Sequence, residues 1–449
     1  MLLTGNIPKI NVGIITEKQI VFELYGDFKI YGMKKNFSGR FTAVIDNNMI
    51  VCKKGKDKIE SINEIVFEPS DFVVDSFFIP EVTIGQNFHW QRKEKQRFMG
   101  SLKLLRADDK IVVINTLPIE DYLFSVISSE MSSKSSLHLL KAHAIVSRSW
   151  TIAQLQMKEN SPEKTAAHAP IISDDEIIRW SDRKQHKLFD VCADDHCQRY
   201  QGIGKITTTN AKQAVIESKG LVLTSSGKIC DSRYSKSCGG ITETFENVWE
   251  PVKYKYLSSI IDYKFEPENY NTDFSIDSNA KKWITGNPHA FCNTNDRRII
   301  NQVLIDYDRE TKDFFRWKVE YTQDELGELI KSKSGIDFGK IKEFIPLERG
   351  CSARIIRLKI IGTLKTLTVG KELEIRRILS PTHLYSSAIY FEKNNIIDDI
   401  PQKFIIHGAG WGHGVGMCQI GAAVMAAQGF QFDEILLHYF QNAKIQKIY

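Results

Sequence analysis

Residues 117–131 read LPIEDYLFSVISSEM, and this stretch decides the class of fold. Pro118 stands at a favourable first helical position, and apolar side chains then recur at helical spacing at Ile119, Leu123, Val126 and Ile127. The spacing predicts an amphipathic helix over 117–131. After a serine-rich turn, a second apolar stripe begins at Leu137 and runs to about Leu155, which predicts a second helix.

The sequence before this helix has a different period. Between residues 10 and 113, short alternating or β-branched runs are separated by turns rich in Gly, Asn and Lys, which is typical of antiparallel β-structure. Further strands are expected near Val215 and at 221–224, 229–234, 355–361 and 364–369, and further helices at 323–332, at 417–428 and from Asp433. The sequence therefore predicts a mixed α+β fold, divided into a β-rich N-terminal accessory region (1–110), a core of helices and strands (111–264 and 400–449) and an inserted mixed α/β lobe (265–399).

Composition excludes several classes of protein. With 42% hydrophobic and 26% charged residues among 449, the chain is neither disordered nor collagen-like. Its formal net charge of +5 is too small an excess over this length to indicate nucleic acid as a partner. No apolar run reaches the roughly 18 residues that cross a bilayer, so we expect no transmembrane segment. Residues 1–16 lack the cationic stretch, long apolar run and cleavage site of a signal peptide, so no export signal is visible in them.

Glu130 is the first candidate for chemistry. Counting back along the helix by 4, 7 and 11 residues gives Val126, Leu123 and Ile119, so the carboxyl group should project from the apolar face. It also lies in the last turn, where unpaired carbonyls carry partial negative charge. That field and burial both favour the protonated carboxyl, the form that a general acid needs. The alternative is a frayed helix end with Glu130 in solvent or paired with an arginine.

A second candidate is a group of four metal ligands within twelve residues: His186, Cys192, His196 and Cys197. Such a mixture of thiols and imidazoles suits tetrahedral zinc. With all four positions filled by protein, the site would be structural and closed rather than an activator of water. A Cys192–Cys197 disulfide and free thiols remain alternatives.

A third candidate is the stretch Gly408–Gly416 (GAGWGHGVG), which has glycine at every second position. As an extended strand it would have one face of bare backbone, against which a broad surface could lie. The other face would show Ala409, Trp411, His413 and Val415. Close packing of the backbone against another element is the alternative. The spacing does not match the glycine pattern of dinucleotide-binding loops.

A fourth candidate, Tyr234–Thr242 (YSKSCGGIT), places Cys238 before two glycines. Nothing local indicates a lowered thiol pKa, so a cysteine nucleophile is disfavoured. A glycine turn that presents hydroxyls and backbone amides to a ligand is the plainer interpretation.

Five ordered segments together resemble the SpoIID/LytB family of bacterial cell-wall proteins, named for a sporulation protein and an amidase modifier. The segments are NTLPIEDYLFSVISSEM (115–131), LKAHAIVSRSW (140–150), HCQRYQG (196–202), YSKSCGGIT (234–242) and GWGHGVGMCQIGA (410–422). The resemblance covers the predicted core, whereas residues 1–110 and 265–400 are only loosely similar to the family's accessory regions.

The resemblance implies a lytic transglycosylase acting on peptidoglycan glycan strands, with Glu130 at the position of the family's catalytic glutamate. One carboxylic acid protonates the glycosidic oxygen between N-acetylmuramic acid and N-acetylglucosamine. As a carboxylate it then takes a proton from the muramic C6 hydroxyl, which closes on C1 to give a 1,6-anhydro end. Because no water attacks, the second carboxylate of ordinary glycoside hydrolases is dispensable.

The same resemblance implies a location in the cell envelope and a zinc-binding loop that some members have and others lack. This loop would brace the segment with Gln198 and Tyr200, which is expected at a glycan groove beside Ser237, His413 and Gln419, with Trp411 stacking on sugar. Three features depart from the family pattern and bear on substrate preference: His143 replaces the usual Gln, Cys418 the common Ser, and serines the Pro and Trp after the glutamate.

Two other hypotheses remain. The main rival is a non-catalytic glycan-binding protein that stimulates a cell-wall amidase, as the LytB side of the resemblance allows. The other is a zinc-stabilised structural protein whose glycine stretch serves only for packing.

Overall fold

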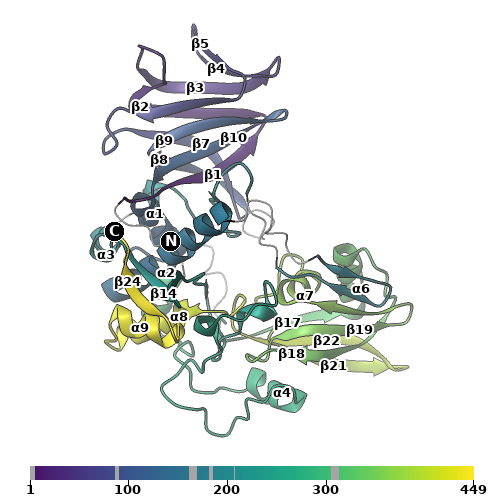
Figure 1. Ribbon diagram of the computed structural model, residues 1–449. Coiled ribbons are helices and arrows are strands. Elements are labelled where there is room, and N and C mark those ends of the chain that lie inside the picture. Colours follow the sequence, from purple (N-terminus) through teal and green to yellow (C-terminus); the bar gives the residue numbers. More distant parts are fainter. Residues whose placement is uncertain (1–5, 86–90, 161–168, 182–185, 207, 305–312) are drawn as a thin grey trace. The chain divides into compact units, whose positions relative to one another are not determined.

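The computed structural model describes residues 6–85, 91–160, 169–181, 186–206, 208–304 and 313–449 (Figure 1). The chain forms two compact units. Unit 1 comprises Met1–Lys158, Gln185–Leu221 and Gln446–Tyr449, and unit 2 comprises Glu159–Lys184 and Val222–Ile445. Helices and mixed sheets confirm the predicted α+β class. The four segments predicted from the sequence are a different division of the chain and stay a prediction.

Unit 1 is built on an 11-stranded sheet with the order β13-β1-β10-β9-β6-β2-β3-β4-β5, to which β7 and β8 are attached through β2 (Figure 1). Its pairs are antiparallel except β1 with β13, as expected for this part of the sequence. Stacked phenylalanines such as Phe22 and Phe41, with ring centroids 5.4 Å apart, fill its core. The strands are β1 (Lys9–Glu17), β2 (Gln19–Lys29), β3 (Phe37–Asp46), β4 (Met49–Lys54), β5 (Asp57–Ser61), β6 (Glu64–Pro69), β7 (Ser76–Ile84), β8 (Arg92–Met99), β9 (Ser101–Ala107), β10 (Lys110–Pro118) and β13 (Val191–Cys192).

Three helices accompany this sheet. Strand β10 leads directly into α1 (Ile119–Glu130), and α2 (Leu137–Asn160) follows, so both helices predicted from the apolar stripes are confirmed. The strand predicted near Val215 is wrong, because that residue belongs to α3 (Thr209–Glu217). Ala211, Ala214 and Val215 are the buried residues of α3, and their spacing is helical. A single β-branched residue was too weak a signal for a strand.

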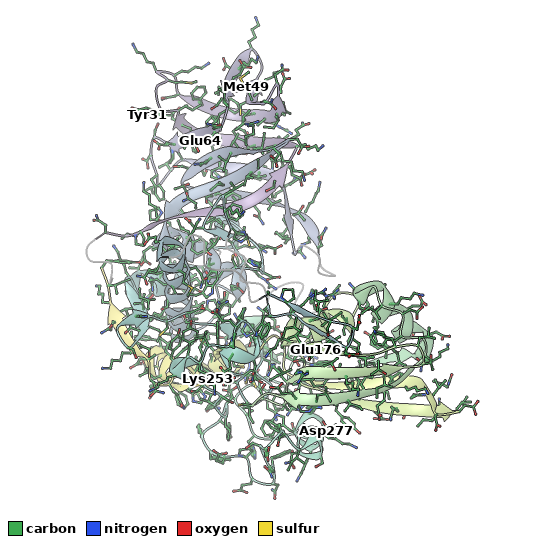
Figure 2. All side chains as sticks on the ribbon, turned by 45° about the vertical axis from the view of Figure 1, so that its right-hand side comes forward. Tyr31, Met49, Glu64, Glu176, Lys253 and Asp277 are labelled. Atoms are coloured by element: carbon green, nitrogen blue, oxygen red, sulfur yellow. The ribbon has the colours of Figure 1, made fainter. Side chains whose placement is uncertain are left out.

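Unit 2 contains a five-stranded sheet with the order β11-β12-β20-β19-β18 and a three-stranded sheet with the order β17-β22-β21. The helix predicted at 323–332 and the strands predicted at 355–361 and 364–369 are present. Glu176 of β12, labelled in Figure 2, accepts a hydrogen bond from Arg357 Nε of β19 at 3.0 Å. The elements are β11 (Ile171–Ile172), β12 (Glu176–Ile178), β17 (Arg316–Thr322), α6 (Gln323–Ser334), β18 (Ile341–Arg349), β19 (Ile355–Gly362), β20 (Thr366–Gly370), α7 (Glu372–Ile378), β21 (Ile389–Ile397) and β22 (Ile400–Ala409).

The remaining elements are short. The helix predicted at 417–428 is found at Gln419–Ala427, and the helix predicted from Asp433 begins at Phe432. Among the helices in the described part of the chain, none is long and apolar enough to cross a membrane. The remaining elements are η1 (Ile203–Lys205), β14 (Leu221–Ser225), β15 (Lys228–Ile229), β16 (Tyr234–Ser235), η2 (Phe245–Asn247), η3 (Lys255–Leu257), α4 (Asp277–Thr285), α5 (Arg297–Val303), β23 (Met417–Cys418), α8 (Gln419–Ala427), α9 (Phe432–Tyr439) and β24 (Lys444–Lys447).

The glycine stretch is not the extended strand that its alternation predicts. Strand β22 ends at Ala409, and Gly410, Gly412, Gly414 and Gly416 all have positive φ angles, between 74° and 93°. The expected bare face is filled by the protein itself. A Cβ at Gly414 would lie 2.4 Å from Arg354 Cζ, and one at Gly416 would lie 2.1 Å from the carbonyl oxygen of Arg233. The alternative of close backbone packing is therefore the one that the structure shows.

This packing predicts a large cost for adding a methyl group at Gly416. Gly416→Ala should lower the free energy of unfolding by about 1–3 kcal/mol more than Gly429→Ala, measured by urea denaturation. Both glycines have positive φ, but a Cβ at Gly429 would meet no atom within 4 Å. The control therefore carries the backbone strain without the clash. Equal costs for the two variants would contradict this account of the loop.

Candidate functional site

Glu130 is the last residue of α1, and its side chain is buried. Only 7% of the residue is exposed, and the chain turns to an extended conformation at Met131. The backbone N–H of Arg199 donates a hydrogen bond to Glu130 Oε1 at 2.9 Å. The carboxyl group thus points inward, as the helical spacing predicts, and it is anchored by a segment 69 residues further along the chain.

The anchoring segment is attached to α1 at several points. The N–H of Gln201 donates to Ser129 Oγ at 3.2 Å, and Ser125 Oγ donates to the carbonyl oxygen of Gly202 at 2.9 Å. These bonds run alongside the one between Arg199 and Glu130. Together they fix residues 199–202 along the last two turns of the helix, and so they fix the position of the Glu130 carboxyl group.

Asp195 is a partly buried acid whose charge interacts with that of Glu130, and sequence reasoning missed it. Burial raises the pKa of Asp195 to about 6; the Arg199 guanidinium opposes this rise, and the charge of Glu130 adds to it. Asp195 pairs with that guanidinium, with Nη2 and Oδ2 3.4 Å apart. The only sequence signal was the spacing of four residues between an acid and a base in a polar loop, which is too common to identify a site.

Gln198 and Tyr200 lie in the interior of unit 1 and not at a surface. Gln198 Oε1 accepts hydrogen bonds from Tyr122 and Thr151, both at 3.1 Å. The ring of Tyr200 stacks on Tyr122 at 5.1 Å, and its hydroxyl donates to Asn115 Oδ1 at 2.5 Å. Each residue is 1% exposed. Both side chains hold the segment that contains Arg199, and neither is exposed to solvent, so the expected contact with a glycan stays a prediction.

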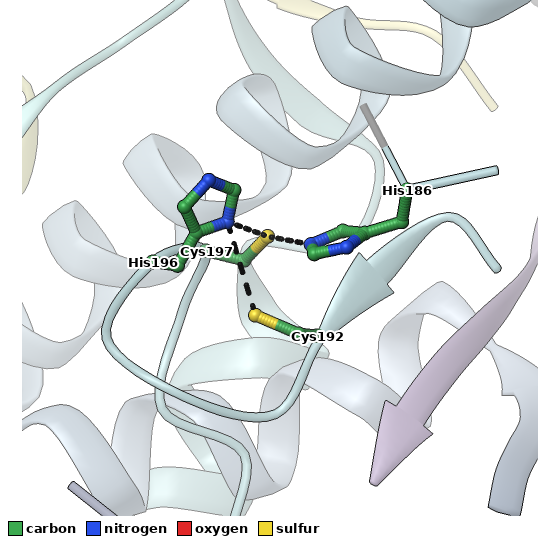
Figure 3. A group of neighbouring side chains, drawn as sticks. All are labelled: His186, Cys192, His196 and Cys197. Carbon is green, nitrogen blue, oxygen red and sulfur yellow. Dashed lines mark hydrogen bonds between the residues drawn. The ribbon is translucent and has the colours of Figure 1, made fainter. Parts of the chain in front are cut away.

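The four metal-ligand candidates converge at one place in unit 1 (Figure 3). Their ligand atoms all lie within 4.8 Å of one another. His186 Nε2 lies 3.3 Å from Cys197 Sγ, and His196 Nδ1 lies 3.4 Å from the same sulfur and 4.0 Å from Cys192 Sγ. Pairing of β13 with β1 fixes Cys192 opposite Gly13. Neither Cys192 nor Cys197 forms a disulfide in this structure.

The electrostatics of this cluster favour a thiolate. Hydrogen bonds, first from Cys197 and then from His186 and His196, lower the pKa of Cys192 to about 2, although burial raises it. Two thiols and two imidazoles are the donor set of a closed tetrahedral zinc site. The residues present therefore fit such an ion.

The other four candidate residues belong to unit 2, and they differ in exposure. Ser237 and Gln419 are 0% and 1% exposed, so neither presents its side chain to solvent. Trp411 is partly exposed and stacks on Phe314, with ring centroids 4.8 Å apart. The expected meeting of these residues with Glu130 at one groove stays a prediction.

His413 is partly exposed, and it is held in one orientation. Its Nδ1 accepts a hydrogen bond from the N–H of Val415 at 3.0 Å. Burial, with the charges of Arg233 and Arg354, lowers the pKa of His413 well below its usual range. The imidazole is therefore neutral at physiological pH, and it can offer hydrogen bonds to a sugar but not a positive charge.

Cys238 is buried in unit 2, and it is not an activated nucleophile. The residue is 2% exposed, and burial raises the pKa of its thiol well above the ordinary range. The two glycines after it pack against the glycine loop and against Trp283. The structure thus agrees with the prediction that disfavours a cysteine nucleophile, but it leaves this turn buried and not presented to a ligand.

Comparisons with known proteins agree with the resemblance. Residues 107–225 match the family model described as Stage II sporulation protein (SpoIID), and residues 243–416 match a domain of unknown function, DUF8618. The SpoIID-matching segment, residues 107–225, contains Glu130 and the whole His186–Cys197 cluster.

Three curated relatives extend the similarity over most of the chain. Stage II sporulation protein D of Bacillus amyloliquefaciens is 23% identical over 74% of this chain and 76% of its own length. An uncharacterized protein of Brachyspira hyodysenteriae is 26% identical over 78% of this chain and 72% of its own length. The amidase enhancer of Bacillus subtilis is 25% identical over 72% of this chain, but the match spans 40% of that protein.

Proposed function

We propose that this protein is a peptidoglycan lytic transglycosylase of the cell envelope, with Glu130 as general acid and then general base. The observation that carries the proposal is the buried Glu130 carboxyl at the end of α1, held by the Arg199 amide inside the SpoIID-matching segment. The SpoIID and amidase-enhancer relatives support a role in the cell wall.

The reaction places two demands on Glu130. As an acid it gives its proton to the glycosidic oxygen, so that the N-acetylglucosamine side leaves as an alcohol. The carboxylate that results accepts the hydrogen bond from the Arg199 N–H, which stabilises its charge. It then removes the proton of the muramic C6 hydroxyl while that oxygen bonds to C1. The acid is regenerated and no water is consumed.

The product of this reaction differs from that of hydrolysis by one water molecule. Purified peptidoglycan, with and without stem peptides, should be incubated with the full chain and its soluble products analysed by mass spectrometry. We expect new muramic ends in the 1,6-anhydro form. New reducing ends, or no glycan release from either substrate, would overturn the proposal.

We also propose that zinc binds His186, Cys192, His196 and Cys197. When bound, the ion supplies a structural cross-link. The cluster can position Arg199, because Cys197 is the last residue of the cluster and Arg199 follows two residues later. Zinc would thus hold the segment whose amide anchors Glu130.

Loss of these thiols should therefore remove metal and loosen the site. The double variant Cys192→Ser/Cys197→Ser should contain about one zinc ion fewer per chain than wild type, by elemental mass spectrometry, and should have a lower Tm. Cys351→Ser, which changes an exposed thiol, is the control and should keep its metal and Tm. Unchanged metal content in the double variant would refute the zinc site.

A second candidate function is stimulation of a cell-wall amidase without cleavage of glycan. The similarity to the amidase enhancer favours it. Under this alternative, the protein binds peptidoglycan and releases no anhydro ends, and an added cell-wall amidase releases stem peptides faster in its presence. Measuring both products in one incubation separates the two functions.

A further inference from the structure

A second group of possible metal ligands lies in unit 2, away from the residues used so far. Cys238, Asp262, Cys292 and Cys418 bring three thiols and a carboxylate together, with all four ligand atoms within 4.8 Å of one another. All four residues are buried, with exposures of 2% or less. A buried carboxylate among three thiols is costly unless hydrogen bonds or a bound cation compensate its charge.

The distances match those around a tetrahedral ion. Two sulfur atoms bound to zinc at about 2.3 Å are about 3.8 Å apart when the site is tetrahedral. Cys238 Sγ lies 3.6 Å from Cys292 Sγ and 3.2 Å from Asp262 Oδ2. Three thiolates and one carboxylate fill a tetrahedral site completely, so the site would be closed and structural.

Groups around the ligands are placed as outer partners of a metal site. Backbone N–H groups point at two of the sulfurs: Gly240 donates to Cys238 Sγ at 3.4 Å, and Gly421 donates to Cys418 Sγ at 3.4 Å. Tyr439 donates its hydroxyl to Asp262 Oδ1 at 2.7 Å, which orients the carboxylate through the oxygen that Cys238 does not contact. Such bonds fix ligand orientation in metal sites.

The charge of the site would also be balanced. Three thiolates and a carboxylate around a divalent ion leave a net negative charge. The Arg316 guanidinium interacts with Cys292 and Cys238, and its Nη1 donates to the carbonyl oxygen of Gly239 at 3.1 Å. His438 Nε2 lies 3.4 Å from Asp262 Oδ1. Two cationic or proton-donating groups thus face the ligands from outside.

We propose that Cys238, Asp262, Cys292 and Cys418 bind a second structural zinc ion. The site links the Cys238 turn, the N-terminus of α8 and two segments of the DUF8618-matching region, which begins after Cys238 and ends before Cys418. Both chain neighbours of Cys292 line a cavity of about 660 Å³. The ion would hold the DUF8618-matching region to the Tyr234–Thr242 turn, against which the glycine stretch Gly408–Gly416 packs.

Metal content tests this site separately from the first. Wild-type protein purified under reducing conditions should contain about two zinc ions per chain. In the Cys192→Ser/Cys197→Ser background, about one should remain, and X-ray absorption at the zinc edge should show sulfur and oxygen ligands without imidazole. Adding Cys292→Ser should remove this ion, whereas adding Cys230→Ser should not. Cys230 is the matched control, because it is a buried thiol of unit 2 that belongs to neither cluster.

Several results would overturn the proposal. The first is that wild type contains about one zinc ion per chain and that the Cys192→Ser/Cys197→Ser variant contains none. This measurement needs no variant of the second site. Another is imidazole scattering in that background. A third is a Cys238–Cys292 disulfide in mass spectra of the alkylated protein. If only the first zinc site fails, wild type should contain one zinc ion per chain. Cys292→Ser should then remove this ion, whereas Cys192→Ser/Cys197→Ser should leave it bound.

Discussion

Replacing Glu130 with glutamine is expected to lower the rate of anhydro-end formation from peptidoglycan by about 10²- to 10⁴-fold, the usual contribution of general acid–base catalysis. Glutamine keeps the shape of the side chain and can still accept the hydrogen bond from the Arg199 N–H. It cannot give a proton to the glycosidic oxygen or take one from the C6 hydroxyl. The loss should therefore fall on the chemical step and leave glycan binding within a few-fold of wild type.

The matched control is Glu159→Gln, which changes an exposed glutamate in the last turn of α2. It should leave both rate and stability unchanged. Thermal unfolding of all three proteins separates a catalytic loss from a folding defect. If Glu130→Gln cleaves glycan as fast as wild type while remaining folded, Glu130 is not the acid.

Replacing Arg148 with methionine is expected to lower the free energy of unfolding by about 3–5 kcal/mol, because it leaves the buried Glu120 without its charge partner. Arg148 Nε and Nη2 donate to the two carboxylate oxygens of Glu120 at 3.0 and 2.7 Å, with side-chain exposures of 0% and 11%. Gly220 N–H and the Tyr449 hydroxyl also donate to Glu120. The pair therefore joins α1 and α2 to the last residue of the chain.

Two further variants show whether the unpaired charge is the cause. Lys18→Met breaks a pair with Asp109 whose side chains are 74% and 65% exposed, and its cost should be much smaller because solvent screens both charges. The double variant Glu120→Gln/Arg148→Met removes both charges and should be more stable than Arg148→Met. Urea denaturation measures all of these. A cost for Arg148→Met no larger than that for Lys18→Met would contradict the account.

The helices around the candidate acid were predictable because their signal is local. Apolar residues at helical spacing define α1 from within fifteen residues, and the same spacing places Glu130 on the buried face. The convergence of the four candidate ligands in unit 1 was also predictable, since they lie within twelve residues of one another. In both cases the groups are close in sequence, so a local pattern is enough to predict their positions without the rest of the fold.

Other features depend on contacts that no local pattern records. The alternating glycines suggest a strand, but the sign of φ is set by what each glycine packs against, and that is the Arg233–Gly239 segment and Arg354. Gln198 and Tyr200 have side chains that suit sugars and protein interiors equally well. The second group of candidate metal ligands was missed because Cys238 and Cys418 are 180 residues apart in sequence.

The central claim is that Glu130 breaks the glycosidic bond without water, and digestion in heavy-oxygen water tests it most directly. Peptidoglycan should be incubated in such water with wild type and with Glu130→Gln, and the new muramic ends analysed by mass spectrometry. The account predicts unlabelled 1,6-anhydro ends from wild type and almost none from Glu130→Gln. Heavy oxygen in the new ends, or equal amounts of anhydro ends from the two proteins, would contradict it.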